Sequence, residues 1–591
     1  MNILDVKNLE ITFFDEDNQA ETAVKQINFS VEAGETLGIV GESGSGKSIS
    51  ALAIMGLLPT NGKITAGEIL FQEKSENQPI NLINLTEEEK RQYRGGKIAM
   101  IFQEPMTSLN PLYSIGFQLT EAIRQHQNIS PSQVRRQAIN LLQEVQLLPD
   151  DSALSALHPH KDEKTQQEYI NQQKRAILQR YPHQMSGGQL QRVMIAMAIS
   201  CNPSLLIADE PTTALDVTIQ ATILQLLREL SQKRHMSVIF ITHDLAVVAN
   251  IADELVVMYQ GKIMERGRAL SLLTNPQHPY TKGLLACRPR LEETREYLPT
   301  VACLMANDGD IPPVELPPKQ IKLNQPLLTV ENLQVGFRKQ GLFSKKNQNY
   351  FWAVKDISFQ IFAGETLGVV GESGCGKSTL AKAILQLIKP YSGKIQFLGE
   401  DLTQLKAHQA KLRGVRRQMQ IVFQNPYNSL NPRLSIGNAI LEPMIIHNAG
   451  GNQQKRRERV SYLLEKVGLS PDWYQRYPHE LSGGQRQRVC IARALALNPQ
   501  LIICDESVSA LDVSIQAQVL NLLKELQREL GLTYIFISHD LSVVKFMADR
   551  VMVMNQGKIE EIATTEQIIN YPQRQYTKKL IASIPQFPEV A

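Results

Sequence analysis

Two stretches of this chain, Gly41-Glu-Ser-Gly-Ser-Gly-Lys47-Ser48 and Gly371-Glu-Ser-Gly-Cys-Gly-Lys377-Ser378, repeat one pattern in which a glycine-rich turn ends in Lys-Ser. Each follows a short apolar run that predicts a strand and opens a run that predicts a helix. The glycines let backbone N–H groups surround phosphates, and the helix N-terminus adds partial positive charge. The lysine reaches the β- and γ-phosphates, and the serine hydroxyl is a ligand for Mg²⁺. A glycine-rich turn alone is usually structural, but this complete context, found twice, predicts two sites for a nucleoside triphosphate.

All eight residues of each loop are candidate nucleotide contacts. They are Gly41, Glu42, Ser43, Gly44, Ser45, Gly46, Lys47 and Ser48 in the first loop, and Gly371, Glu372, Ser373, Gly374, Cys375, Gly376, Lys377 and Ser378 in the second.

The repetition extends far beyond the loops. In both halves the loop is followed by a Gln before Ser-Leu-Asn-Pro, a Ser-Gly-Gly-Gln run, an Asp-Glu pair, an Ala-Leu-Asp turn and a His. The 57 positions from Ser186 to His243 equal those from Ser482 to His539. Upstream, the first half has 25 additional residues, which fall in the polar stretch near 151–175 and are expected to form a solvated loop or helix extension.

This order of motifs resembles the nucleotide-binding domains of ABC transporters, and the chain resembles two such domains fused. More narrowly, it is similar to the subfamily that imports peptides, nickel and glutathione. That similarity rests on Gly-Glu-Ser-Gly in each loop, on the Ser-Leu-Asn-Pro runs, and on the tail Asn275-Pro-Gln-His-Pro-Tyr-Thr-Lys282, with a weaker copy at Tyr571-Pro-Gln-Arg-Gln-Tyr-Thr-Lys578. The resemblance implies an α/β fold with two P-loop domains. Each would have an antiparallel β subdomain, a RecA-like parallel-sheet core and a helical subdomain.

Chain length and the positions of the prolines indicate the domain boundaries, and charge, hydropathy and cysteine content indicate the class of protein. The 591 residues suffice for two domains, and five prolines between 306 and 328 predict a linker. We therefore expect a first domain at 1–290, a Pro-rich linker at 291–328 and a second domain at 329–591. A net charge of +3 gives no electrostatic case for nucleic acid, and no apolar run approaches the ~20 residues that span a bilayer. Six cysteines without a C-x-x-C pair indicate reduced thiols.

The chemistry of phosphoryl transfer to water requires charge neutralisation, a metal ion and a group that orients the water. Asp209 and Asp505 end apolar runs that predict parallel strands, which brings each carboxylate to the edge of the sheet beside a loop. The glutamate that follows each is the candidate general base. The candidate catalytic residues are Glu210, Glu506, His243, His539, Gln103 and Gln424, and the candidate Mg²⁺ ligands are Ser48, Gln103, Asp209, Ser378, Gln424 and Asp505.

The Ser-Gly-Gly-Gln runs look like helix N-termini, which bind anions. The resemblance implies that each run covers the ATP held by the loop of the other half, in a head-to-tail pair within one chain. These candidate contacts are Ser186, Gly187, Gly188, Gln189, Ser482, Gly483, Gly484 and Gln485. Phe13 and Phe337 close the first strand of each half and are candidates for stacking on adenine, although a packing role is equally compatible and Phe14 and Phe351 lie nearby.

The resemblance implies an ATPase that uses ATP and Mg²⁺ to drive uptake of dipeptides, oligopeptides or glutathione. Its implied partners are two membrane permease subunits and an extracytoplasmic solute-binding protein, and its implied place is the cytoplasmic face of the inner membrane, as a peripheral protein. Two alternatives are a tandem ABC factor acting on ribosomes, which would be expected to have a long charged linker, and a tandem ATPase for sugar or nickel import. The sequence does not identify the solute.

Overall fold

The computed structural model describes residues 1–584 except 16, 18, 74–77, 158, 160–161, 214, 308–316, 339–349 and 406–409. The chain divides into two compact units. The first consists of Met1–Leu215 and Ile219–Leu285, and the second consists mainly of Ala286–Ile584. Among the described residues, no helix combines the length and the apolar character that a membrane crossing requires.

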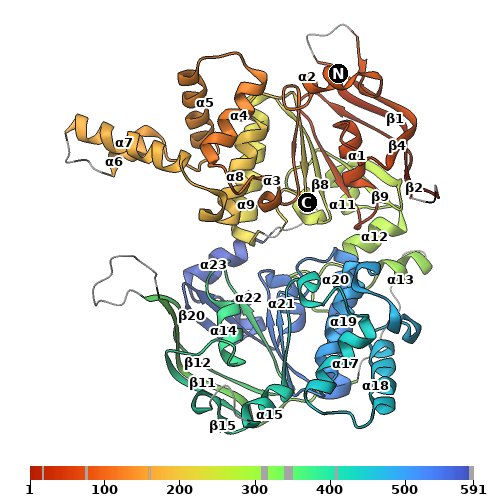
Figure 1. Ribbon diagram of the computed structural model, residues 1–591, viewed down its shortest axis with the longest axis vertical. Coiled ribbons are helices and arrows are strands. Elements are labelled where there is room, and N and C mark those ends of the chain that lie inside the picture. Colours follow the sequence, from red (N-terminus) through yellow and green to blue (C-terminus); the bar gives the residue numbers. More distant parts are fainter. Residues whose placement is uncertain are drawn as a thin grey trace. The chain divides into compact units, whose positions relative to one another are not determined.

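Each unit contains one antiparallel and one mainly parallel sheet (Figure 1). The antiparallel sheet of the first unit has the order β2-β1-β4-β5, and the six-stranded sheet has the order β10-β9-β3-β8-β7-β6. The bounds are β1 Asn2–Phe14, β2 Ala20–Glu32, β3 Thr36–Val40, β4 Gly62–Phe71, β5 Ile80–Asn81, β6 Ile98–Ile101, β7 Leu205–Asp209, β8 Ser237–Thr242, β9 Glu254–Tyr259 and β10 Lys262–Arg268.

The second unit repeats this topology, with the orders β12-β11-β14-β15 and β16-β17-β18-β13-β19-β20. The bounds are β11 Lys322–Arg338, β12 Tyr350–Ala363, β13 Thr366–Val370, β14 Ser392–Phe397, β15 Glu400–Asp401, β16 Met419–Val422, β17 Leu501–Asp505, β18 Thr533–Ile537, β19 Arg550–Asn555 and β20 Lys558–Thr564. The predicted α/β architecture, with an antiparallel and a parallel layer in each half, is confirmed.

Burial explains why the core strands form as predicted. All residues of β3, β7, β13 and β17 are buried, as is typical of parallel strands covered on both faces. In each unit one hydrophobic cluster joins the antiparallel sheet, the helix after the phosphate loop and the parallel sheet. The phosphate loop is therefore anchored on both sides by a continuous core.

Helices complete each unit. In the first unit they are α1 Lys47–Ile54, α2 Glu87–Tyr93, α3 Pro105–Ser108, α4 Ile115–His126, α5 Pro131–Glu144, α6 Asp151–Ala156, α7 Glu163–Leu178, α8 Gly187–Ala198, α9 Val217–Arg234, α10 Leu245–Val248, α11 Ala269–Thr274 and α12 Pro279–Ala286. In the second they are α13 Val301–Ala306, α14 Lys377–Ile384, α15 Ala410–Gln418, α16 Pro426–Ser429, α17 Ile436–Ile446, α18 Gln453–Lys466, α19 Gly483–Leu495, α20 Val513–Leu530, α21 Leu541–Met547, α22 Thr565–Asn570 and α23 Gln575–Ala582. Helices α4, α5 and α8 contact one another, as do α17, α18 and α19, which gives each unit its helical subdomain.

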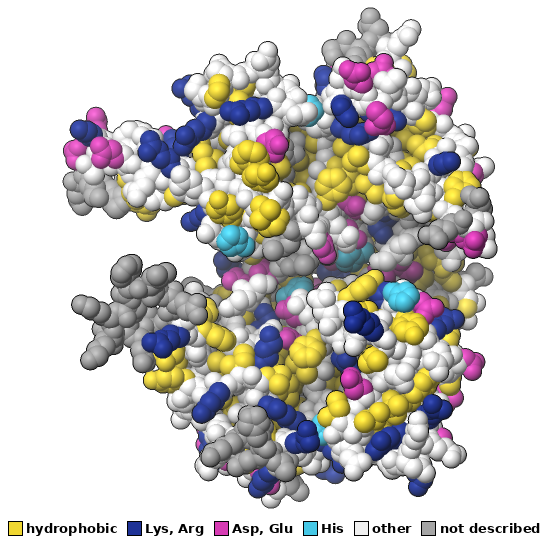
Figure 2. All heavy atoms as spheres, in the orientation of Figure 1, with side chains coloured by type: hydrophobic (Ala, Val, Ile, Leu, Met, Phe, Trp, Pro, Cys, Tyr) yellow, Lys and Arg dark blue, Asp and Glu magenta, His cyan; other side chains and the backbone are white. Residues whose placement is uncertain are grey.

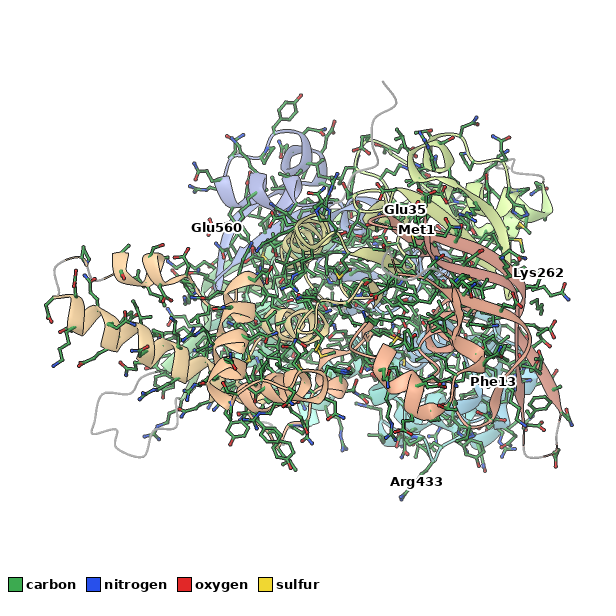
Figure 3. All side chains as sticks on the ribbon, turned by 90° about the horizontal axis from the view of Figure 1, so that it is seen from above. Met1, Phe13, Glu35, Lys262, Arg433 and Glu560 are labelled. Carbon is green, nitrogen blue, oxygen red and sulfur yellow. The ribbon has the colours of Figure 1, made fainter. Side chains whose placement is uncertain are left out.

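The additional segment near 151–175 is helical. It forms α6 and most of α7, which extend away from the rest of the first unit (Figures 1 and 3). Lys174 pairs with Asp151 at 2.6 Å and ties the two helices together. The segment is thus a helix extension, one of the two forms expected from its polar composition.

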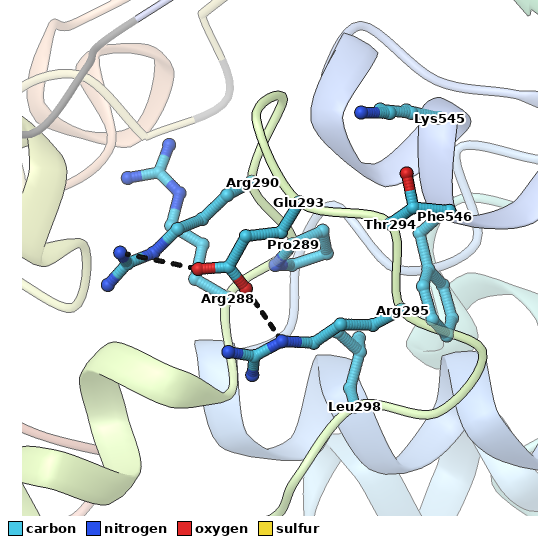
Figure 4. A pocket seen from close by; sticks show the side chains of 9 residues that line it. All are labelled: Arg288, Pro289, Arg290, Glu293, Thr294, Arg295, Leu298, Lys545 and Phe546. Atoms are coloured by element: carbon cyan, nitrogen blue, oxygen red, sulfur yellow. Dashed lines mark ion pairs between the residues drawn. The ribbon is translucent and has the colours of Figure 1, made fainter. Parts of the chain in front are cut away.

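The segment expected to begin the linker packs on the second unit. The side-chain amide of Asn521, which is 2% exposed, accepts from the Leu298 N–H at 2.9 Å and donates to the Leu298 carbonyl at 2.8 Å. Beside this contact a small hollow is lined by the loop 288–298 and by α21, and Glu293 lies between Arg290 and Arg295, at 3.6 and 2.6 Å (Figure 4). Residues 291–307 therefore belong to the second unit, and the division at 291 and 329 into separate domains stays a prediction.

Candidate functional site

Parallel strands bring the candidate residues of the first unit to one edge of the sheet. Strands β3, β6, β7 and β8 run parallel, and their carboxyl ends lead directly to the phosphate loop, Gln103, Glu210 and His243. In open α/β sheets this edge is where ligands bind. The second unit places its phosphate loop, Gln424, Glu506 and His539 at the same edge by the same topology.

The first phosphate loop is built around a buried lysine. Lys47 is 5% exposed, and its Nζ donates to the carbonyl oxygens of Gly41 and Glu42, both at 2.8 Å. Gly46 caps α1 with φ of 97°, and a Cβ there would lie 3.0 Å from the carbonyl oxygen of Ala23. Both the backbone angle and the close approach require glycine.

The second loop has the same geometry. Lys377 Nζ donates to the carbonyl oxygens of Gly371 and Glu372 at 2.7 and 3.0 Å. Gly376 caps α14 with φ of 109°. The main difference is Cys375, whose Sγ lies 3.8 Å from Lys377 Nζ, where the first loop has Ser45.

Each loop serine lies against the aspartate that ends β7 or β17, the second strand along the sheet from the strand before the loop. Ser48 Oγ donates to Asp209 Oδ1 at 3.0 Å, and Ser378 Oγ donates to Asp505 Oδ1 at 3.0 Å. Burial raises the pKa of Asp209 to about 6 and outweighs the opposing hydrogen bond from Ser48; burial also raises the pKa of Asp505. A hydroxyl and a carboxylate oxygen beside a phosphate site fit Mg²⁺, which takes few protein ligands and completes its shell with phosphate oxygens and water.

Glu210 is held by three side chains. Its carboxylate accepts from Gln103 Nε2 at 2.8 Å and from Thr213 Oγ1 at 2.9 Å, and it lies 3.2 Å from His243 Nδ1. Burial alone would raise the pKa of Glu210, but the hydrogen bond and charge of His243 lower it to about 2. The same contact raises the pKa of His243 against the effect of burial. The carboxylate is therefore ionised at neutral pH and fixed beside the loop.

Glu506 is held less tightly. Gln424 Nε2 donates to Glu506 Oε2 at 2.7 Å, but His539 Nδ1 is 3.9 Å from the same oxygen. Ser509 stands at the position of Thr213, and its hydroxyl donates to the backbone carbonyl of Glu506 at 2.9 Å. Burial would raise the pKa of Glu506, but the nearby His539 outweighs this effect and lowers it. The two sites thus share one set of residues but differ in how firmly the glutamate is oriented.

Both glutamates have an unfavourable backbone conformation. The φ angle is 46° at Glu210 and 48° at Glu506, in the left-handed region. A non-glycine residue there costs on the order of 1–3 kcal/mol and persists where the surrounding structure enforces it. Because the strain recurs at both copies, it fits a role in aiming the carboxylate at the site.

The signature runs form helix caps, as predicted. Ser186 Oγ accepts from the Gln189 N–H at 3.4 Å and Gln189 Oε1 accepts from the Ser186 N–H at 3.1 Å; Ser482 and Gln485 make the same pair at 3.3 and 2.9 Å. The two glycines of each run differ. A Cβ on Gly188 would lie 2.6 Å from Ile219, and one on Gly484 would lie 2.2 Å from Ile515.

The second glycine of each signature is therefore needed for packing against the next long helix. A Cβ on Gly187 or Gly483 would meet only ordinary contacts, at 3.6 and 3.9 Å. Those two first glycines remain candidates for ligand approach, and the contact of either signature with ATP stays a prediction.

The aromatic candidates lie on the antiparallel sheets. Phe13, labelled in Figure 3, is partly buried, and a Cβ on Gly62 would come within 2.8 Å of its ring. Phe337 is 43% exposed and pairs across the sheet with Phe351, which is 54% exposed. The ring of Phe13 is therefore partly used in packing within the sheet, whereas the exposed ring of Phe337 is accessible for stacking.

Two tyrosines that the sequence did not single out contact the loops. The hydroxyl of Tyr280 accepts a hydrogen bond from the Glu42 N–H, and that of Tyr576 accepts one from the Glu372 N–H, each at 3.1 Å. Both stand in the repeated tails, as the Tyr of Tyr-Thr-Lys. Their recurrence at matching positions was the available signal, but only the fold shows that the tail reaches the loop.

The two glutamates generate the first prediction. Glu210→Gln combined with Glu506→Gln should lower ATP turnover at least ~10²-fold, since an oriented base contributes about 10²–10⁴-fold. Nucleotide affinity should stay close to that of the parent protein, because the loops are unchanged. Steady-state hydrolysis and equilibrium nucleotide binding measure both effects. Near-normal turnover in the double variant would remove both glutamates from the mechanism.

Cys375 generates the second prediction. Burial raises the pKa of its thiol above the usual value of 9.0, so the reactive thiolate fraction, and with it the rate of maleimide labelling, should rise about tenfold per pH unit up to that pKa. Labelling should inactivate the second site sterically, ATP should protect, and Cys375→Ser should resist inactivation. Equal inactivation of Cys375→Ser would assign the effect to another cysteine, such as the partly exposed Cys201 or Cys303.

Comparison with known proteins agrees with this geometry. Residues 24–213 and 354–509 match the family described as "ABC transporter", and residues 264–312 and 561–590 match the "Oligopeptide/dipeptide transporter, C-terminal region". The chain is 46% identical over 590 residues to the glutathione import ATP-binding protein GsiA of Pectobacterium atrosepticum, covering 99% of this chain and 89% of that protein. The identity to GsiA of Escherichia coli is also 46% over 590 residues, covering 99% and 90%.

Among solved structures, one match is cbiO1 of Clostridium perfringens, part of the ABC transporter complex cbiONQ. The identity is 29%, the TM-score is 0.36, and the match covers 42% of this chain and 91% of that chain. The full-length identity to GsiA and the doubled family match decide the assignment. This chain belongs to the ABC transporter family and is an ATPase with two ATP-binding cassettes in one polypeptide.

Proposed function

We propose that this ATPase drives an importer of small peptides, with glutathione, dipeptides and oligopeptides as the candidate solutes. The observation that carries the proposal is that both halves keep a complete and similarly placed catalytic set: lysine, serine, aspartate, glutamate, glutamine and histidine. The tail that matches the oligopeptide and dipeptide transporter region is present in both halves, and relatives at 46% identity are named for glutathione import.

In this proposal Ser48, Asp209 and Gln103 would hold Mg²⁺ in one half, and Ser378, Asp505 and Gln424 would hold it in the other. The metal neutralises charge on the phosphates when it is bound. Lys47 and Lys377 hold the β- and γ-phosphates. Glu210 and Glu506 orient and deprotonate the attacking water, and His243 and His539 contact the γ-phosphate. The remaining loop residues contact the nucleotide, and Phe13 and Phe337 lie against its adenine.

The proposal also places the two halves head to tail, so that Ser482 and its neighbours cover the ATP on Lys47, and Ser186 and its neighbours cover the ATP on Lys377. A helix N-terminus with free space at its first glycine suits an anionic γ-phosphate. Nothing within one half requires a second phosphate cradle, which supports this pairing.

Exposed apolar residues at the helical subdomain of the first half support contact with a membrane permease. Leu112, Tyr113 and Phe117 are 79%, 47% and 47% exposed, and the rings of Tyr113 and Phe117 stack at 4.5 Å. Hydrophobic side chains gather on the face over α3 and α4 (Figure 2). Contiguous exposed apolar surface of this kind marks interaction sites.

The corresponding surface of the second half differs. Counted from the shared Ser-Leu-Asn-Pro run, Arg433, Leu434 and Asn438 take the places of the three apolar residues. Two chemically different surfaces fit two different permease subunits. The assembly would also include an extracytoplasmic solute-binding protein and would hold this ATPase as a peripheral protein on the cytoplasmic face of the inner membrane.

Uptake measurements test the proposal. A strain that lacks this chain should lose ATP-dependent uptake of at least one labelled solute among glutathione, dipeptides, tripeptides and oligopeptides. The wild-type gene should restore uptake, whereas the Glu210→Gln/Glu506→Gln gene, expressed to the same level, should not. Unchanged uptake of every one of these solutes would contradict the peptide proposal. Co-sedimentation with ribosomes in place of co-purification with permeases would favour the ribosomal alternative.

A further inference from the structure

The peptide group that joins Gly41 to Glu42 is held from both sides. Its carbonyl oxygen, on Gly41, accepts from Lys47 Nζ at 2.8 Å. Its N–H, on Glu42, donates to the hydroxyl of Tyr280 at 3.1 Å. One plane of atoms therefore links the phosphate-binding lysine to a tyrosine that lies 238 positions away in the chain.

The second site repeats this arrangement in its own unit. The Gly371 carbonyl oxygen accepts from Lys377 Nζ at 2.7 Å, and the Glu372 N–H donates to the hydroxyl of Tyr576 at 3.1 Å. Burial raises the pKa of Tyr576 to about 12, so its hydroxyl stays neutral at physiological pH. Two copies with the same atoms and distances make a chance contact a poor explanation.

The tails that carry the tyrosines are anchored rather than loose. The carboxylate of Glu265, on β10, accepts from the N–H groups of Gln277 and His278 at 2.8 and 3.2 Å. Glu561, on β20, accepts from the N–H groups of Gln573 and Arg574 at 3.0 and 3.3 Å. Each tail is thus fixed to the last strand of its sheet, immediately before the helix that presents the tyrosine.

The first tyrosine has additional support. Tyr280 is fully buried, and its ring lies 4.3 Å from the ring of Tyr259, the last residue of β9. Asn555 ends β19 at the matching position, so the second tyrosine lacks this aromatic neighbour. We expect the first hydroxyl to be the more rigidly placed of the two.

We infer that Tyr280 and Tyr576 are positioning residues for ATP binding, which orient the first peptide group of each phosphate loop and through it the phosphate-binding lysine. Glycine at the start of the loop leaves its own ψ angle, one of the two angles that flank this peptide group, weakly restricted. The tyrosine hydroxyl holds the N–H on the outer side, so that the carbonyl oxygen stays directed at the lysine. Hydrogen bonds at the two ends of one peptide group also polarise each other favourably.

This role assigns a function to the tail itself. The regions that match the oligopeptide and dipeptide transporter family, 264–312 and 561–590, contain the anchoring glutamates and the tyrosines. The tail is then a component of the nucleotide site, and the inference does not depend on which solute is transported.

The test measures each site with the other disabled. Tyr280→Phe in a Lys377→Ala background reports the first site, and Tyr576→Phe in a Lys47→Ala background reports the second. Each change removes one oxygen atom and keeps the ring. The KM for ATP should rise about tenfold, the factor equivalent to about 1.4 kcal/mol, and kcat should change less than twofold. The lysine contacts phosphate in both the ground and transition states, so its displacement alters binding more than turnover.

Two matched controls separate positioning from packing. Tyr259→Phe removes the hydroxyl of the neighbouring ring, which accepts a hydrogen bond from Gln260. Tyr571→Phe removes a hydroxyl from a residue of the second tail that is 71% exposed. Both should leave KM unchanged, and titration with a fluorescent ATP analogue should show the same pattern in dissociation constants. An unchanged KM in Tyr280→Phe and Tyr576→Phe, with or without a lower melting temperature, would overturn the inference, as would an equal rise in the controls.

Discussion

The rest of each half depends on one constraint: a buried ammonium group must be held at a fixed place beside the phosphate loop. Lys47 and Lys377 meet this constraint through carbonyl oxygens at the start of their own loops. Backbone carbonyls solvate the charge and fix the direction of each lysine side chain. The Asp209 and Asp505 carboxylates end β7 and β17, two places along the sheet from the strands that lead into the loops, and accept hydrogen bonds from the loop serines. The parallel sheet supplies this separation, because its strands end at one edge while their side chains remain apart.

The two sites contain the same types of catalytic candidate but differ in how many contacts hold the glutamate. Glu210 is bound by Gln103, Thr213 and His243, whereas Glu506 has the histidine at 3.9 Å and loses the hydroxyl contact to its carboxylate. Cys375 and the missing aromatic neighbour of Tyr576 are further differences on the second side. All of these changes surround the catalytic groups and leave them in place. Two active sites with unequal rates are the expected result.

The sequence predicted the parts of the site that are local in the chain. The loops, the Asp-Glu strand ends and the signature caps are decided by a few adjacent residues, and each is found where its motif stands. The contacts of Glu210 with Gln103 and His243 were not predicted, because they depend on the order of the strands in the sheet. The φ angles of 46° and 48° at the two glutamates were not predicted either, since no residue type in the motif requires them.

Contacts between distant segments could not be predicted from one sequence. The hydrogen bonds of Tyr280 and Tyr576 to the loops, and the amide pair that fixes Leu298 on Asn521, depend on how the tail and the linker fold back on the sheets. The packing of Phe13 beside Gly62 is another such contact, and the sequence left it open beside stacking on adenine. Proline content predicted an extended linker but could not show that its first part adheres to α20.

The central proposal is that one chain carries two ATP sites, each completed by the signature of the other half. A double-mutant cycle of ATPase activity tests it most directly, because variants that disable one composite site should not add, whereas variants that disable different sites should. Ser482→Arg with Lys47→Ala should be little worse than either change alone, and Ser482→Arg with Lys377→Ala should abolish ATPase activity. The reverse pattern, with Ser482→Arg and Lys377→Ala no worse than either alone, would show that each half completes its own site and would contradict the account.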